Sequence, residues 1–141
     1  MSINCIRTLI EDANVSNPDK IALVFGNEKL TYRELFTKVN QIAYYLAELD
    51  LPKGSRIGIY SNKGIDQVIA ILAILSTNYV LVPLTKLLKA EQVEYIIGDC
   101  DIKCIITDKI KLESIEEIKF DGHIISYETS HKDLPSFEEI Y

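Results

Sequence analysis

Residues 56–84 constrain the fold more than any other stretch of this sequence. Residues 56–60 form a short, mainly apolar run, and residues 65–75 are apolar except for Asp66 and Gln67. A second short apolar run, residues 79–82, ends at Pro83. A strand, a helix and a strand in so short a span predict a βαβ unit, whose two strands are parallel and joined by a right-handed crossover.

The helix of this unit is apolar on nearly all sides. Its large aliphatic side chains are Ile65, Val68, Ile69, Ile71, Leu72, Ile74 and Leu75. Burying them contributes at most about 10 to 20 kcal/mol, and ordering the backbone costs roughly 1 to 2 kcal/mol per residue. Because these free energies nearly cancel, we expect the helix to need a sheet on one side and a second cover on another.

Further helices and strands follow from the periodicity of the apolar residues. The pattern predicts helices over residues 2–13, 31–50, 90–97 and 110–118, and strands over residues 21–25, 29–30, 103–107 and 123–126. The second helix has the clearest start, because Thr31 and Glu34 form a capping box between Leu30 and Leu35. From Glu128 onward the sequence is polar and shows no closing element.

Strands that alternate with helices predict an α/β fold. We expect one layered domain over residues 1–141, with a mostly parallel sheet and helices on both faces. At 141 residues the chain is long enough to bury a core.

Composition excludes several classes of function. The net charge is −6, and no cluster of lysine and arginine supplies a face for nucleic acid. The longest apolar run is too short to span a membrane, and the first residues do not resemble a signal peptide. Cys5, Cys100 and Cys104 are odd in number and widely spaced, which favours a reducing cytoplasm.

Two groups of residues are candidates for a binding site. Residues 61–64, Ser-Asn-Lys-Gly, join a strand to a helix N-terminus, where anions bind readily. The loop lacks the glycines and the Lys-Ser/Thr pair of a phosphate loop, so a capping turn is the favoured interpretation. Cys100 and Cys104 could bind zinc together with His123 or His131, but burial of the cysteines is favoured over metal binding.

Other polar and aromatic residues have structural interpretations. Glu113, Glu116 and Glu117 fit a solvated helix face, and Tyr44 and Tyr45 are expected to pack beside the apolar stripe. No serine or cysteine lies in a recognisable nucleophile motif with histidine and aspartate. We therefore assign no catalytic, cofactor-binding or metal-binding residue to this chain.

Several segments in order resemble the opening of adenylate-forming enzymes, which include acyl-CoA synthetases, peptide-synthetase adenylation domains and luciferases. The similar segments are residues 17–24, 30–35, 53–57, 73–84 and 90–108. Thr77-Asn78 stands where that family usually has Ala-Gly, and Thr85 where it usually has Asp. The resemblance implies the N-terminal subdomain of the adenylate-forming fold.

The family's catalytic segments are absent from this sequence. They include a Thr/Ser/Gly-rich phosphate loop, a Tyr-Gly-x-Thr-Glu segment, a ribose-binding Asp and a Lys of the C-terminal domain. The resemblance implies an ATP- and magnesium-dependent parent that activates a carboxylate as acyl-AMP and passes it to CoA or a carrier-protein thiol. It also implies a second subdomain and a C-terminal domain as packing partners, and we expect apolar surface on residues 64–77 and their sheet to be uncovered.

Two other functions remain open. The chain could be a free-standing, non-catalytic interaction module derived from such an enzyme, and uncovered apolar surface would then favour homo-oligomers. A flavodoxin-like nucleotide binder is less favoured, because no loop has the composition that cradles phosphate.

Overall fold

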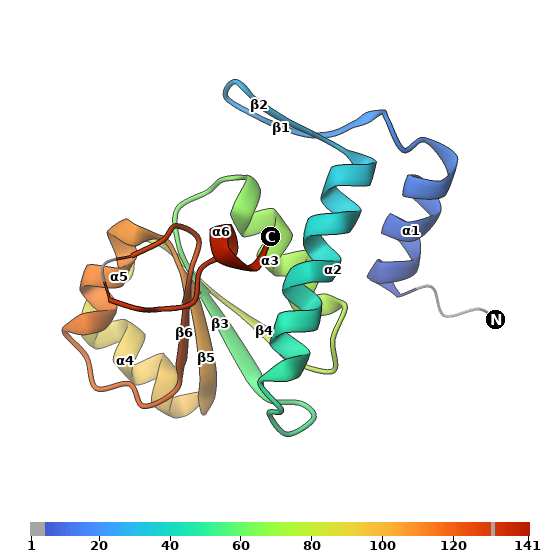
Figure 1. The fold of residues 1–141 in the computed structure, drawn as a ribbon. Coiled ribbons are helices and arrows are strands. Elements are labelled where there is room, and N and C mark those ends of the chain that lie inside the picture. The colour runs from blue at the N-terminus through green and yellow to red at the C-terminus, as the bar shows by residue number, and fades with distance from the viewer. Residues whose placement is uncertain (1–4, 131) are drawn as a thin grey trace.

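The computed structural model describes residues 5–130 and 132–141, and a four-stranded parallel sheet lies at its centre (Figure 1). The strands are β3 (Arg56–Tyr60), β4 (Val80–Leu84), β5 (Ile102–Thr107) and β6 (His123–Ser126), in the order β4-β3-β5-β6. Every neighbouring pair in this sheet is parallel. The predicted α/β fold with a mostly parallel sheet is therefore confirmed.

Helices connect successive strands of this sheet. Helix α3 (Ile65–Leu75) joins β3 to β4, α4 (Ala90–Asp99) joins β4 to β5, and α5 (Lys109–Glu116) joins β5 to β6. The chain first moves from β3 to one neighbour, β4, and then returns to the other neighbour, β5. The strand order thus reverses between β3 and β5.

Alternation along the strands divides the core into two parts. Ile57 and Ile59 of β3 belong to a buried cluster with α3 and α2 (Tyr32–Glu48). Tyr60 belongs to a second cluster, with residues of α4 and α5. Figure 1 shows α4 and α5 on one side of the sheet and α2 and α3 on the other. Helices cover both faces, as the apolar runs in the strands require.

The second cover of α3 comes from this chain. Ile69, Ala70, Ala73 and Ile74 of α3 are fully buried, and they share a cluster with Leu35, Val39, Ile42 and Leu46 of α2. The expectation of uncovered apolar surface holds in part: Leu75, which ends α3, and Val80, which begins β4, are exposed, and Ile65, Val68, Ile71 and Leu72 are half-buried. A partner outside these 141 residues is thus not needed to bury the inner faces of α3.

Helix α2 begins at the predicted capping box. Thr31 Oγ1 accepts a hydrogen bond from the Glu34 backbone N–H at 3.2 Å, and the Thr31 N–H donates to Glu34 Oε2 at 2.8 Å. The Thr31 backbone N–H and the Thr31 hydroxyl both donate to Glu34 Oε2 and hold the pKa of Glu34 below its ordinary value. The structure confirms the box, which satisfies backbone donors that the helix itself cannot pair.

The first elements lie outside the sheet. Helix α1 (Ile6–Ser16) lies beside α2, and a hairpin of β1 (Ile21–Phe25) and β2 (Glu28–Thr31) extends from the body (Figure 1). The start expected for α1, at Ser2, lies outside the described residues. No residue of α1 is buried, and Val24 and Phe25 of the hairpin are more than half exposed. This region therefore carries much of the exposed apolar surface.

Strand β4 does not stop at Pro83 as predicted. Pro83 lies within β4 and pairs in register with Ile59 of β3. Strand β4 is the edge of the sheet, so its other side has no strand that would need the missing proline N–H.

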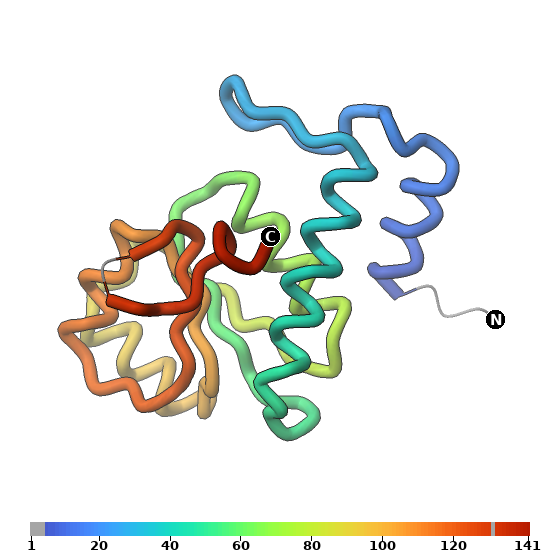
Figure 2. The backbone as a smooth tube through the Cα atoms, viewed as in Figure 1, coloured from blue at the N-terminus to red at the C-terminus, as the bar shows by residue number. Residues whose placement is uncertain are grey.

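The chain also has a closing element that the sequence pattern did not predict. Helix α6 (Phe137–Ile140) begins at Ser136, whose Oγ accepts from the Glu139 N–H at 3.3 Å. The Phe137 ring is fully buried and packs edge-on against Tyr127, with 5.1 Å between the ring centroids. Figure 2 shows the C-terminal segment returning across the sheet to α2, where Lys38 Nζ lies 3.4 Å from the centre of the Tyr141 ring.

We expect Phe137→Ala to lower the free energy of unfolding by about 3 to 5 kcal/mol, because it leaves a cavity in the main core. Phe25→Ala is the matched control: Phe25 is 51% exposed, and its loss should change stability by about 0.5 kcal/mol or less. Urea unfolding followed by circular dichroism measures both. Equal effects of the two variants would show that α6 does not close the core.

Candidate functional site

Polar side chains gather at the carboxyl edge of the parallel sheet. Ser61 and Asn62 follow β3, Asp108 follows β5, and Tyr127 follows β6. The edge between β3 and β5 is where the strand order reverses. In open α/β sheets, ligands bind outside the carboxyl ends of strands at such a point. This edge is therefore the candidate functional site.

Asp108 joins the loops that follow β3 and β5. Its Oδ2 accepts from the Asn62 backbone N–H at 2.6 Å and from Asn62 Nδ2 at 2.9 Å. Its Oδ1 accepts from the Lys111 N–H at 2.7 Å and so caps α5. Both carboxylate oxygens are engaged within the chain, which indicates a structural role for Asp108.

The loop of residues 61–64 is a turn into α3. Gly64 occupies the N-cap position and makes no side-chain capping bond. The backbone N–H of Asn62 is already directed to Asp108. The structure thus agrees with the favoured turn interpretation of this loop.

Ser61 lies beside a tyrosine hydroxyl at this edge. Its Oγ lies 2.9 Å from the Tyr127 hydroxyl, and Gln67 Nε2 donates to Ser61 Oγ at 3.4 Å. Burial raises the pKa of Tyr127 well above its ordinary value. Tyr127 therefore keeps its proton at neutral pH and cannot serve as a base that activates Ser61.

A hollow of about 490 Å³ opens beside these groups. Four carboxylates line it, those of Glu28, Asp66, Asp108 and Glu128, together with Lys63 and the exposed Phe25 ring. Tyr141 Oη donates to Asp66 Oδ1 at 3.5 Å. Burial raises the pKa of Asp66 above its ordinary value, and the nearby Glu128 acts in the same direction.

The residues considered for zinc are not brought together in the described part of the chain. Cys104 is fully buried in β5, where burial raises its pKa to about 12, and Cys100 is half-buried at the end of α4. His123 is exposed at the start of β6, and His131 lies outside the described residues. Over residues 5–130 and 132–141, no three histidine, cysteine or acidic side chains form a group that could hold a metal.

The remaining candidates lie on helix surfaces. Glu113, Glu116 and Glu117 are exposed, and Glu116 forms an ion pair with Lys132. Tyr45 is half-buried against the core, as predicted. The packing prediction is wrong for Tyr44, which is 70% exposed. Its position on the outer side of α2 follows from helix phase, since Tyr44 lies two residues beyond the buried Ile42.

Comparison with known proteins identifies the family. The AMP-binding enzyme family matches residues 10–140. This chain belongs to that family. Tyrocidine synthase 1 of Brevibacillus parabrevis is 32% identical over 120 residues, and gramicidin S synthase 1 of Brevibacillus brevis is 34% identical over 123 residues. The alignments cover 85% and 87% of this chain but only 11% of each synthase.

Solved structures of adenylate-forming enzymes share the fold. The anthranilate CoA ligase AuaEII, solved with anthranoyl-AMP, superposes with a TM-score of 0.88 at 22% identity. A benzoate CoA ligase from Burkholderia xenovorans superposes with a TM-score of 0.86 at 19% identity. The matches cover 97% and 98% of this chain, but 27% and 28% of those enzymes. The chain thus corresponds to the N-terminal portion of adenylate-forming enzymes.

The described helices also bear on membrane insertion. Within residues 5–130 and 132–141, none combines the length and the apolar character that crossing a bilayer requires.

We expect Asp66→Asn to stabilise the chain at pH 7. The raised pKa of Asp66 means that the folded state binds this proton more tightly than the unfolded state. The resulting stability is present below the carboxyl's unfolded pKa and is lost as the pH rises through the folded pKa. The free energy of unfolding of the variant should therefore exceed that of the unchanged chain above the folded pKa of Asp66. The difference should disappear as the pH falls below the unfolded pKa.

Urea unfolding at a series of pH values measures this difference. Asp121→Asn, at an exposed loop position, controls for the loss of one carboxylate. A gain in the free energy of unfolding that does not change with pH would show that burial of the Asp66 carboxylate is not its cause.

Proposed function

We propose that this chain forms the N-terminal structural part of an ATP-dependent acid–thiol ligase and has no catalytic activity alone. The supporting observation is one of extent: the family matches residues 10–140, yet the chain spans about 11% of the first curated relatives. In the proposed parent, a carboxylate attacks the α-phosphorus of ATP, and acyl-AMP and pyrophosphate form. CoA or a carrier-protein thiol then takes the acyl group.

The chemistry of the carboxyl edge is consistent with this proposal. Asp108 is engaged by Asn62 and Lys111, and the hydroxyl of Ser61 lies beside a tyrosine that keeps its proton. Four carboxylates at the hollow disfavour the triphosphate of ATP. We therefore propose no catalytic, cofactor-binding or metal-binding residue here, and ATP and magnesium act in the parent.

We further propose that residues 1–141 form one domain in a reducing cytoplasm, where Cys5, Cys100 and Cys104 remain thiols. The three cysteines are free in the structure. The second subdomain and the C-terminal domain of the parent are its proposed partners.

Pyrophosphate exchange tests the absence of activity. The purified 141-residue chain, with ATP, magnesium and a broad panel of acids, should give no acid-dependent exchange. A full-length adenylating relative in parallel shows that the assay works, and circular dichroism shows that the chain is folded. Acid-dependent exchange by the chain alone would refute the proposal.

The alternative function is a free-standing interaction module. It is favoured by the hairpin, which has two open strand edges and exposes Val24 and Phe25 by 61% and 51%. The nucleotide sequence after the codon for Tyr141 separates the two proposals. A phosphate-loop sequence downstream supports the ligase parent, and a stop codon supports the module.

We expect the isolated chain to self-associate through the hairpin. Light scattering should give a mass that rises with concentration, and Phe25→Glu should reduce it to that of one chain, because a charge on the apolar edge opposes pairing. Leu87→Glu is the matched control, since Leu87 is 81% exposed and lies in the loop between β4 and α4. A mass of one chain at all concentrations would contradict the expectation.

A further inference from the structure

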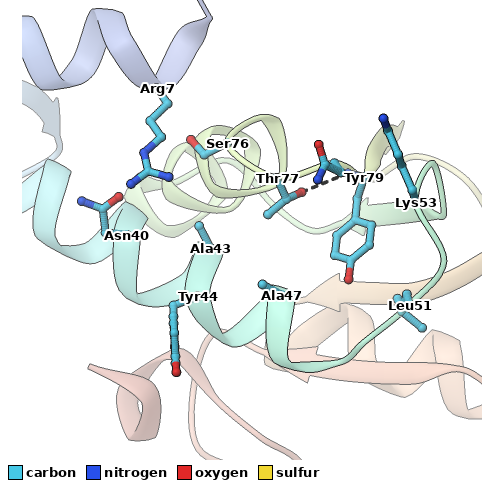
Figure 3. Close-up of a pocket in the computed structure, with 11 residues that line it drawn as sticks. Arg7, Asn40, Ala43, Tyr44, Ala47, Leu51, Lys53, Ser76, Thr77 and Tyr79 are labelled. Carbon is cyan, nitrogen blue, oxygen red and sulfur yellow. Dashed lines mark hydrogen bonds between the residues drawn. The ribbon is translucent and has the colours of Figure 1, made fainter.

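A second hollow lies at the opposite, amino-terminal edge of the sheet. It has a volume of about 590 Å³, between α1, the second half of α2 and the loops that precede β3 and β4 (Figure 3). We call it the α1–α2 groove. This volume is in the range of small-molecule sites in proteins. The family resemblance and the carboxyl-edge cluster do not account for it.

The groove exists because α2 presents small side chains on this side. Asn40, Ala43 and Ala47 follow one another along a single face of α2 and line the groove. The adjoining face carries Val39, Ile42 and Leu46, which fill the core. Tyr79 and Leu51 complete apolar parts of the wall. The lining thus offers room and apolar contact together.

The charge of the lining is unlike that of the chain. Asp and Glu outnumber Lys and Arg by 21 to 15 in the whole sequence. The groove's lining includes Arg7 and Lys53 but no acidic residue. The ion pairs in the described part of the chain involve other cations, namely Arg33, Lys103 and Lys132. In Figure 3 the Arg7 side chain extends from α1 toward Asn40 and Ser76.

The C-terminus of α3 is an obvious alternative partner for Arg7, because helix ends attract cations. The Leu72, Ala73 and Ile74 carbonyls, however, already accept hydrogen bonds within the chain. Ser76 Oγ donates to the Leu72 carbonyl at 2.7 Å, and Thr77 Oγ1 donates to the Ile74 carbonyl at 2.6 Å. The Arg7 guanidinium is thus not needed to satisfy those carbonyls.

We propose that the α1–α2 groove binds a small organic anion, with its carboxylate or phosphate on Arg7 and its apolar body over Ala43 and Ala47. A planar guanidinium pairs with either anion through two parallel hydrogen bonds. Lys53, at the far side of the groove, adds a second positive charge. The proposal is independent of the proposed ligase parent.

Amide chemical shifts of the 15N-labelled chain test the site directly. The probes are 4-phenylbutyrate, phenyl phosphate and the neutral 4-phenylbutan-1-ol. The two anions should produce saturable shifts at Ala43, Ala47 and residues 76–79, and the alcohol should produce much weaker ones. The stronger of the two anions identifies carboxylate or phosphate as the preferred group.

Three variants assign the binding energy. Arg7→Gln should weaken anion binding about tenfold, the effect of losing one charge-assisted contact of roughly 1.4 kcal/mol. Ala47→Leu should abolish it by filling the groove, and leucine at this exposed helix position is compatible with folding. Arg33→Gln is the matched control, because Arg33 lies on α2, which lines the groove, but pairs with Asp19 outside the groove.

Four results would overturn the proposal. The first two are chemical-shift changes as large with the alcohol as with the anions, and changes that centre on Asp108 or the hairpin. The other two are a loss of anion binding in Arg33→Gln equal to that in Arg7→Gln, and no saturable chemical-shift change with either anion. If Arg7→Gln lowers the free energy of unfolding while no anion binds, Arg7 supports the fold alone.

Discussion

The packing of α3 between the sheet and α2 is the interaction on which the rest of this structure depends. An apolar helix requires cover on more than one side, and α2 supplies the second side with the stripe of Leu35, Val39, Ile42 and Leu46. The capping box at Thr31 fixes where α2 begins, and so fixes which of its residues face α3. A local signal of two side chains thus sets the register of the main helix–helix contact in the core.

The sequence predicts much of this arrangement for identifiable reasons. Residues 56–84 determine the parallel βαβ unit because their apolar runs have the lengths of strands and a helix. Thr31 and Glu34 determine the start of α2. The prediction that the strand ends at Pro83 is wrong, because a residue without an N–H is excluded only from a strand that pairs on both sides. Strand β4 is at the edge of the sheet, and the order of the strands is not visible in the sequence.

The features that the sequence did not predict share a physical cause. Phe137 lies in a polar tail more than fifty residues after the end of α3. Its burial depends on a pocket formed by Tyr127 and the sheet. The Asp108–Asn62 contact likewise joins residues 46 positions apart. Asn62 and Asp108 come together because β3 and β5 are parallel neighbours in the sheet. The sequence shows which residue types follow each strand, but their pairing depends on topology.

Because α2 covers α3, the question of whether this portion folds without its neighbours is separate from the question of whether it is part of a longer enzyme. Full-length relatives are several times longer, which suggests that this portion needs its neighbours in order to fold. Yet its inner faces are buried by its own residues, and many of the exposed apolar groups lie on α1 and the hairpin. Burial in the core thus supports a stable fold without the catalytic segments. The exposed hairpin, by contrast, is where contact with other protein surfaces would bury further apolar area.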